Sequence, residues 1–140
     1  MDSDTDAVVD LWRACGLTVA WNDPYKDILR KRHVGPEFFL VAEATHRIVG
    51  TVMGGYDGHR GNVNYLGVLP DVRGDGVGRQ LMDAVEVLLM AAGCPKINLC
   101  VRATNIGAIG FYETLGYSRD SVVLLGKRLI PDILDVPSGI

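Results

Sequence analysis

The sequence lacks a surplus of positive charge and a long apolar run, and each absence narrows the range of possible functions. Its 17 acidic residues outnumber its 14 basic ones, which argues against a dedicated nucleic-acid-binding protein. No uninterrupted apolar stretch is long enough to span a membrane. The acidic residues 1–6 also lack the basic and apolar regions of a signal peptide. We therefore expect a cytoplasmic protein that binds neither nucleic acid nor a membrane.

Usable cysteine pairs are also lacking. Cys15, Cys94 and Cys100 cannot all pair within one chain, and they show no Cys-x-x-Cys spacing, so reduced thiols are the simplest interpretation. Cys94 follows a glycine that ends a predicted helix, and Cys100 lies in an apolar stretch, so both are expected in the core. The three histidines show no metal-ligand spacing, and no metal site is predicted.

The length predicts one domain over residues 1–140, because such a chain is too short for two. Hydrophobic residues make up 48% of the chain and charged residues 22%, ordinary proportions for a globular protein with its own core. No internal repeat or low-complexity segment is present. Residues 131–140 are interpreted as a C-terminal tail without assigned structure.

Hydrophobic spacing predicts an α/β fold of the α+β kind, with helices on both faces of one sheet. Two N-terminal helices are expected, at 7–15 and from Pro24 to about His33, the second with Asp23 as its cap. A meander of three antiparallel strands follows. A long helix, a strand, a shorter helix and a final strand complete the pattern. The expected strands cover 38–44, 48–56, 63–68, 97–101 and 121–129, and the later helices cover 78–92 and 108–115.

The segment from Leu66 to Arg79 carries the clearest chemical signal. An apolar strand ends at Val68, a glycine-rich turn follows, and a long helix begins at once. Backbone amides at a helix N-terminus bind phosphate, and glycines let a ligand approach the main chain. Arg73 and Arg79 add positive charge for more than one phosphate. The segment contains neither the P-loop pattern nor the GxGxxG fingerprint of dinucleotide-binding folds.

Two motifs carry a family resemblance. Residues 73–78, Arg-Gly-Asp-Gly-Val-Gly, resemble the acyl-CoA loop of the GNAT superfamily of N-acetyltransferases, (Arg/Gln)-x-x-Gly-x-(Gly/Ala). Residues 105–117 match the second family signature, Asn-x-x-Ala-x-x-Phe-Tyr-x-x-Leu-Gly-(Phe/Tyr), at the family's spacing of one helix and one strand. Further strings, such as Trp-Asn-Asp-Pro at 21–24, are similar to the bacterial YpeA-like branch. The resemblance covers about residues 6–130, and two signatures in order are more specific than either alone.

The resemblance implies a splayed mixed β-sheet in which the strands at 63–68 and 97–102 part near their ends. The pantetheine arm of acetyl-CoA would fill the gap, and its pyrophosphate would lie on the loop amides. Asn105 would help to hold the CoA arm, or cap the following helix, or both. The implied cofactor-binding residues are Leu66, Gly67, Val68, Arg73, Gly74, Asp75, Gly76, Val77, Gly78, Arg79, Asn105 and Tyr112.

The resemblance also implies that Tyr112 is catalytic, as the general acid for the leaving CoA thiolate. A phenol is neutral at pH 7 and has a proton to give. The simpler alternative is that Tyr112 packs in the core beside Phe111. A backbone amide of the strand before the loop would stabilise the oxyanion. That strand carries no carboxylate, so water or another group would take the amine proton, with Glu43, Asp57 and His59 as candidates.

The implied activity is transfer of an acetyl group from acetyl-CoA to a primary amine of a small molecule or peptide. Loops expected near the acceptor supply the candidate substrate contacts, Trp21, Asn22, Asp57, His59 and Arg60, whose acidic members mildly favour a cationic acceptor. Two alternatives stay open. One is a CoA-binding regulatory or sensor domain without efficient turnover, and the other is a subunit that works only inside a larger complex.

The chain departs from the family at its N-terminus. Family members usually open with a strand before the first helix, but residues 2–6 show no strand pattern. A missing or truncated first strand would leave the strand at 38–44 on the edge of the sheet, where its backbone groups are free to pair. A homodimer could cover that edge.

Overall fold

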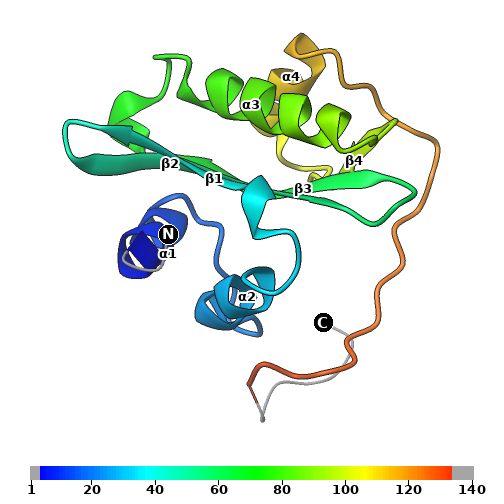
Figure 1. Ribbon diagram of the computed structural model, residues 1–140, viewed down its shortest axis with the longest axis horizontal. Helices are drawn as coiled ribbons and strands as arrows, with labels where there is room; N and C mark the ends of the chain where they lie inside the picture. The colour runs from blue at the N-terminus through cyan, green and yellow to red at the C-terminus, as the bar shows by residue number, and fades with distance from the viewer. Residues whose placement is uncertain (1–3, 134–140) are drawn as a thin grey trace.

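Residues 4–133 are described by a computed structural model, in which four strands form one mixed sheet between two layers of helices (Figure 1). Helices α1 and α2 lie on one face of the sheet, and α3 and α4 lie on the other (Figure 1). The predicted α/β fold with helices on both faces is therefore confirmed. The elements are α1 (Thr5–Ala14), α2 (Pro24–Lys31), η2 (Pro36–Phe38), β1 (Phe39–Ala44), β2 (Arg47–Tyr56), β3 (Gly61–Val68), η3 (Pro70–Val72), α3 (Val77–Ala91), β4 (Ile97–Leu99) and α4 (Ile106–Thr114).

Helix α1 packs its apolar side on the sheet, as its spacing predicts. Val8, Leu11 and Trp12 are buried in one cluster with Phe39 of β1. Trp12 Nε1 donates a hydrogen bond of 2.9 Å to Thr51 Oγ1, which satisfies the buried indole. Burying one large apolar side chain stabilises a fold by about 1.5–3 kcal/mol, so this cluster fixes α1 firmly against the sheet.

Helix α2 begins at the residue that the sequence predicts. The Asp23 side chain accepts hydrogen bonds from the amides of Tyr25 and Lys26, and Pro24 occupies the first helical turn. A helix of 8 residues is not stable alone. Its cap and the buried Ile28 therefore hold it in place.

Strands β1, β2 and β3 form the predicted antiparallel meander, and β4 pairs parallel to β3. In the β2–β3 turn, Asp57 Oδ1 accepts hydrogen bonds from the amides of His59 at 2.7 Å and Arg60 at 2.8 Å. No strand precedes α1 within residues 4–133, and β1 lies at the edge of the sheet. The expected edge position of this strand is therefore confirmed.

Two glycines of β2 let α3 pack close to the sheet. A Cβ at Gly50 would lie 2.9 Å from Leu81 Cδ1, and a Cβ at Gly54 would lie 2.6 Å from Val85 Cγ2. Real side chains cannot approach so closely, so only glycine admits the helix at this distance. Leu81 and Val85 are buried there in a second cluster with Met82.

The predicted final strand at 121–129 is wrong. These residues have no regular structure, and Val122, Val123, Leu124 and Leu125 are 76–88% exposed. An apolar, β-branched segment becomes a strand only where a neighbour supplies hydrogen bonds, and β4 is shorter than expected, ending at Leu99. The chain instead runs from α4 towards the α2 side of the sheet (Figure 1). Of the predicted tail at 131–140, residues 134–140 lie outside the described residues.

None of the helices within residues 4–133 is both long and apolar enough to cross a bilayer.

Candidate functional site

Strand β3 loses one of its two neighbours halfway along its length, which opens the sheet. Its antiparallel pairing with β2 continues to Val68, whereas its parallel pairing with β4 joins only residues 61–63 to 97–99. From Asn64 onward, β3 has no second neighbouring strand among the described residues. The predicted parting of these two strands is confirmed, and it leaves backbone groups of β3 free to bind a ligand.

A β-bulge at Tyr65 changes which side chains of β3 lie on each face of the sheet. Between Thr51 and Met53 of β2, the register gains one residue on β3. Tyr65 has a φ of +52°, a left-handed conformation that is rare for any residue other than glycine. Asn64 and Tyr65 therefore both line a cleft on the α2 side, whereas Leu66 packs on the α3 side.

The loop between β3 and α3 exposes backbone amides that have no acceptor. Gly74 and Gly76 have φ values of +93° and +84°, and a Cβ at either would meet nothing within 4 Å. Gln80 donates the first hydrogen bond of α3, of 3.0 Å, to the Gly76 carbonyl. No hydrogen bond of the described chain uses the amides of residues 76–79, and the first turn has no acidic residue. An open cradle of amides at a helix N-terminus fits a phosphate group.

The two arginines of this loop lie differently. Arg73 Nε donates a hydrogen bond of 3.0 Å to the Val68 carbonyl, so its side chain folds back over the end of β3. Arg79 is exposed in the first turn of α3 and has no ion-pair partner in the described part of the chain. Arg79 therefore offers the loop's uncommitted positive charge.

Helix α4 brings Tyr112 to the α3 side of the sheet. Its cap is Asn105, which accepts a hydrogen bond from the Ala108 amide at 3.1 Å, so the capping role is confirmed. A Cβ at Gly78 would lie 3.2 Å from Phe111 Cζ, so this glycine lets α4 lie close to α3. Burial raises the pKa of the Tyr112 hydroxyl. A phenol with a raised pKa keeps its proton at pH 7 and remains a donor.

A cleft of about 780 Å³ opens on the opposite face of the sheet. Its walls come from α2, the end of β2, β3 and the segment after β4. Its polar and reactive lining residues are Asp27, Arg30, Lys31, Tyr56, Asp57, Asn62, Asn64, Tyr65, Cys100 and Arg102. Because Asn64 and Tyr65 belong to the stretch of β3 that lacks a second neighbour, the cleft and the opening in the sheet share this strand.

One wall of the cleft is a hydrogen-bonded cluster around Asp27. Asp27 Oδ2 accepts hydrogen bonds from Tyr65 Oη at 2.5 Å and from Asn22 Nδ2 at 2.6 Å. The Tyr65 ring stacks on Trp12 with centroids 3.8 Å apart. Burial, followed by the hydrogen bond to Asp27, raises the pKa of Tyr65 far above its ordinary value. Tyr65 is therefore a fixed hydrogen-bond donor and cannot act as a base at neutral pH.

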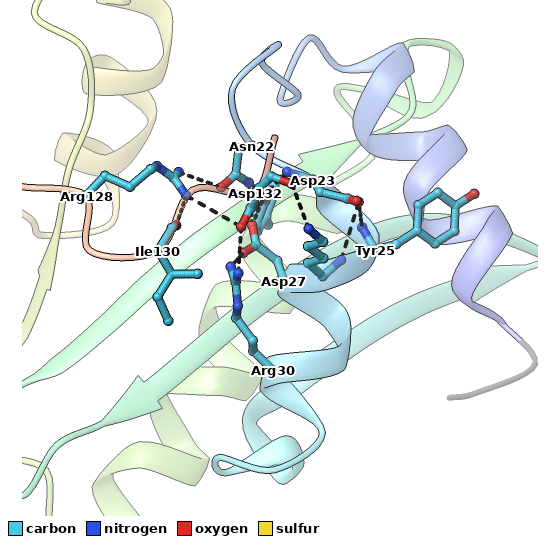
Figure 2. A network of polar contacts seen from close by, with 10 residues as sticks. Asn22, Asp23, Tyr25, Asp27, Arg30, Arg128, Ile130 and Asp132 are labelled. Carbon is cyan, nitrogen blue, oxygen red and sulfur yellow. Dashed lines mark hydrogen bonds and ion pairs between the residues drawn. The ribbon is translucent and has the colours of Figure 1, made fainter. Parts of the chain in front are cut away.

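Asp132, which lies far from α2 in the sequence, contacts residues of the same wall and holds them in place (Figure 2). Its side chain is fully buried and pairs with Arg30 at 2.6 Å and Arg128 at 3.5 Å. It also accepts a hydrogen bond of 2.8 Å from the Asp23 amide at the start of α2. Arg128 in turn donates to Asn22 Oδ1 at 3.0 Å. Burial opposes ionisation of Asp132, but these donors outweigh it and hold its pKa below the ordinary value.

The structure brings together only some of the predicted acceptor contacts. Asp57 lines the cleft, and Asn22 belongs to its Asp27 cluster. Trp21, His59 and Arg60 do not line the cleft, and Arg60 bonds the His59 carbonyl within the exposed turn. Asp57 accepts hydrogen bonds from two turn amides, and these bonds hold the pKa of its carboxyl group below the ordinary value. Asp57 is therefore a weak base.

The other candidate base, Glu43, lies elsewhere. It is exposed on the edge strand β1, which is separated from β3 by β2.

Sequence reasoning missed Asp27, Lys31, Tyr65 and Arg102. Asp27 and Lys31 are four residues apart in α2, and this spacing places them on one helical face, which was the available signal. The sequence carried no such signal for Tyr65, because the β-bulge decides which face of the sheet its side chain lies on. The expected core position of Cys100 is wrong: its side chain is exposed and lines the cleft, because β4 ends before it. Cys94 is partly buried against the α3-side cluster.

Within residues 4–133, no group of three or more His, Cys, Asp or Glu side chains is arranged to hold a metal ion.

The sheet thus opens beside a glycine-rich helix N-terminus and carries a polar cleft on its other face, so two surfaces that can bind ligands share strand β3. Residues 5–117 match the model of the acetyltransferase (GNAT) family, and the chain belongs to that family. It is 53% identical over 130 residues to an acetyltransferase of Yersinia enterocolitica, covering 93% of this chain and 92% of that one. The protein is accordingly an acetyltransferase.

Solved structures agree with this assignment. Ard1 from Thermoplasma volcanium is 26% identical, with a TM-score of 0.71, and the match covers 81% of this chain and 78% of that one. Naa20 from Chaetomium thermophilum, solved with a bisubstrate analogue, is 28% identical with a TM-score of 0.69, covering 84% and 68%. The open mixed sheet and its helices thus match the fold of these two structures.

Proposed function

We propose that the protein transfers the acetyl group of acetyl-CoA directly to a primary amine of a small molecule or peptide. The observation that carries this proposal is the row of acceptor-free amides at residues 76–79, next to the stretch of β3 that lacks a second neighbour. An acyl-CoA has a pyrophosphate and an amide-containing arm, which are the groups that such a cradle and such a strand edge can bind.

The donor side is assigned as follows. The amides from Gly76 to Arg79 and the side chain of Arg79 bind the pyrophosphate, and the open edge of β3 at Leu66 and Val68 pairs with the arm. Bound acetyl-CoA supplies an electrophilic thioester carbon. Arg73 contributes its charge if it exchanges the Val68 carbonyl for a phosphate oxygen.

Proton transfer is assigned to two groups. Tyr112 gives its proton to the departing thiolate, a role supported by its place on the α3 side and by a pKa that burial keeps above neutral. A backbone amide of β3 stabilises the oxyanion. The amine proton leaves through water in the cleft, because both oxygens of Asp27 already have partners and the turn amides hold the pKa of Asp57 below its ordinary value, which makes it a weak base.

Calorimetric titration with acetyl-CoA tests the donor site, and a panel of amines with thiol detection tests transfer. We expect micromolar binding that Gly76→Glu abolishes, because Gly76 has a φ of +84° and a glutamate would bring negative charge into the cradle. Gly126→Glu is the matched control, since Gly126 is exposed with open space around it. Absence of binding by folded protein would refute the proposal. Binding with no amine-dependent thiol release would instead favour a regulatory or sensor domain.

A further inference from the structure

We infer that the amine acceptor carries an anionic group, most simply a carboxylate, and that Arg102 with Lys31 selects it. This inference rests on the proposed amine acetylation and names the substrate class of the same cleft. It depends on which charges in the cleft are already neutralised within the protein and which are left for a ligand.

One of the two carboxylates of the cleft is fully used within the protein. Asp27 accepts hydrogen bonds from Tyr65 and Asn22 through Oδ2 and an ion pair from Arg30 through Oδ1. Asp57 accepts hydrogen bonds from two turn amides through Oδ1 alone and lies in an exposed turn. Asp27 therefore cannot hold an ammonium group without giving up existing partners, and Asp57 is the one carboxylate left to do so against three cationic side chains, which weakens the case for the cationic acceptor that the sequence mildly favours.

The cations of the cleft are only partly used. Three cationic side chains line the cleft, compared with two carboxylates. Arg30 is paired with Asp27 and with the buried Asp132. Lys31 Nζ donates to the Gly54 carbonyl but has no carboxylate partner among the described residues.

Arg102 is the least committed of the three. It is exposed, lines the cleft in the segment after β4, and its side chain has no hydrogen-bond or ion-pair partner in the described part of the chain. A guanidinium binds a carboxylate through two parallel hydrogen bonds, so Arg102 offers a ready site for such a group.

Lys31 is positioned by the strand beneath it. A Cβ at Gly55 would lie 3.5 Å from Lys31 Nζ and 3.1 Å from Asn62 Oδ1, so the glycine admits both side chains over the end of β2. Burial lowers the pKa of Lys31, and the charge of Glu37 offsets this only in part. An acceptor anion beside the ammonium group would offset the rest.

A positive cleft also helps the reaction. Nearby positive charge lowers the pKa of an incoming amine and so favours the neutral, nucleophilic form. The same two side chains would thus bind one end of the acceptor and promote deprotonation of the other. This explains how the site can work without a carboxylate base on β3.

The test compares acceptors that differ only in the anion: 4-aminobutanoate against butylamine, and glycine against glycinamide, with putrescine as the cationic probe. We expect kcat/KM to be about tenfold higher for each carboxylate than for its neutral partner, as a charge-assisted bidentate contact provides. Equal or better use of butylamine or putrescine would overturn the inference while leaving amine acetylation intact.

Substitutions of Arg102 test whether this residue causes the preference for anionic acceptors. Arg102→Gln should lower kcat/KM for 4-aminobutanoate about tenfold and lower kcat/KM for butylamine much less, because only the first acceptor loses a charge-assisted contact. Arg102→Glu should reverse the order and favour putrescine. Arg119→Gln is the matched control, because Arg119 is exposed and outside the cleft. Equal effects of Arg102→Gln on charged and neutral acceptors, or equal effects of both Gln variants, would contradict the inference.

Binding gives an independent readout if turnover is slow. Calorimetry on the CoA-saturated protein should show 4-aminobutanoate binding more tightly than butylamine, and Arg102→Gln should remove the difference. No difference in the wild type would overturn the inference, whatever the activity. Loss of CoA binding itself would refute the proposed function, so the two failures can be told apart.

Discussion

The two faces of the sheet would bind substrates in different ways under the proposed function. The α3 face offers backbone amides of one continuous segment, residues 76–79, next to a loop that glycines keep open. The α2 face uses side chains from α2, β2, β3 and the segment after β4, held by the distant Asp132. A backbone site leaves a contiguous glycine pattern in the sequence, whereas a side-chain site assembled from distant segments leaves none.

The largest effect is expected from removal of the Tyr112 hydroxyl, which tests the role proposed for the α3 face in the chemical step. Tyr112→Phe should lower kcat about 100-fold without weakening acetyl-CoA binding, because loss of a general acid affects the chemical step. Tyr117→Phe is the control, since Tyr117 Oη is committed to Glu86 at 2.6 Å on the same face. Stopped-assay kinetics and calorimetry measure the two quantities. Equal loss in both variants would show that Tyr112 only packs.

Removal of Asp132 should damage the α2 face alone. Asp132→Ala leaves Arg30 and Arg128 without their buried partner, and we expect about 2 kcal/mol less stability in urea unfolding, because partly exposed arginines regain some hydration. Acceptor KM should rise while acetyl-CoA affinity is kept. Asp120→Ala, which breaks an exposed 3.0 Å pair with Lys96, should cost less than about 1 kcal/mol. A stronger effect on acetyl-CoA binding than on the acceptor would contradict the separation of the faces.

Tyr65 lies on the strand that both faces share, so its variant measures how independent they are. Tyr65→Phe keeps the stacking on Trp12 but loses the hydrogen bond to Asp27. We expect about 1 kcal/mol lower stability and a few-fold higher acceptor KM, with unchanged acetyl-CoA affinity. Urea unfolding and the same kinetic assay check this. A matching loss of acetyl-CoA affinity would show that the bulge couples the two sites.

The smallest expected effect is a pH dependence of the Asp132 anchor. Its folded-state pKa lies below the ordinary value, so its ionised form stabilises the fold above the unfolded pKa of about 3.9. That contribution is lost as the pH falls through the folded-state pKa. Unfolding curves should therefore show the difference between wild type and Asp132→Asn shrinking in acid. A difference that stays constant through this range would argue that the hydrogen bonds alone hold the anchor.

Features that depend only on neighbouring residues could be predicted from the sequence. The cap at Asp23, the apolar stripe of α1, the meander and the cap at Asn105 each depend on neighbouring residues, and the structure confirms them. The glycine loop belongs to the same class, because its amides and its conformation come from one short segment.

Residues 121–129 show the opposite case. Their apolar, β-branched composition favours a strand, but hydrogen bonding to a neighbour decides whether one forms, and no such neighbour is present among the described residues. The same dependence on neighbours shortened β4 and left Cys100 exposed.

The sequence by itself determined the family, the antiparallel meander and the helix N-terminus that fits a phosphate, because each follows from contiguous residues. Only the tertiary structure decided the cleft that we propose for the acceptor. The cleft depends on a bulge at Tyr65, a contact between Asp132 and α2, and the presence of Arg102 in the same lining as residues of α2. These are contacts between residues far apart in the chain, and sequence periodicity carries no information about which distant side chains will meet.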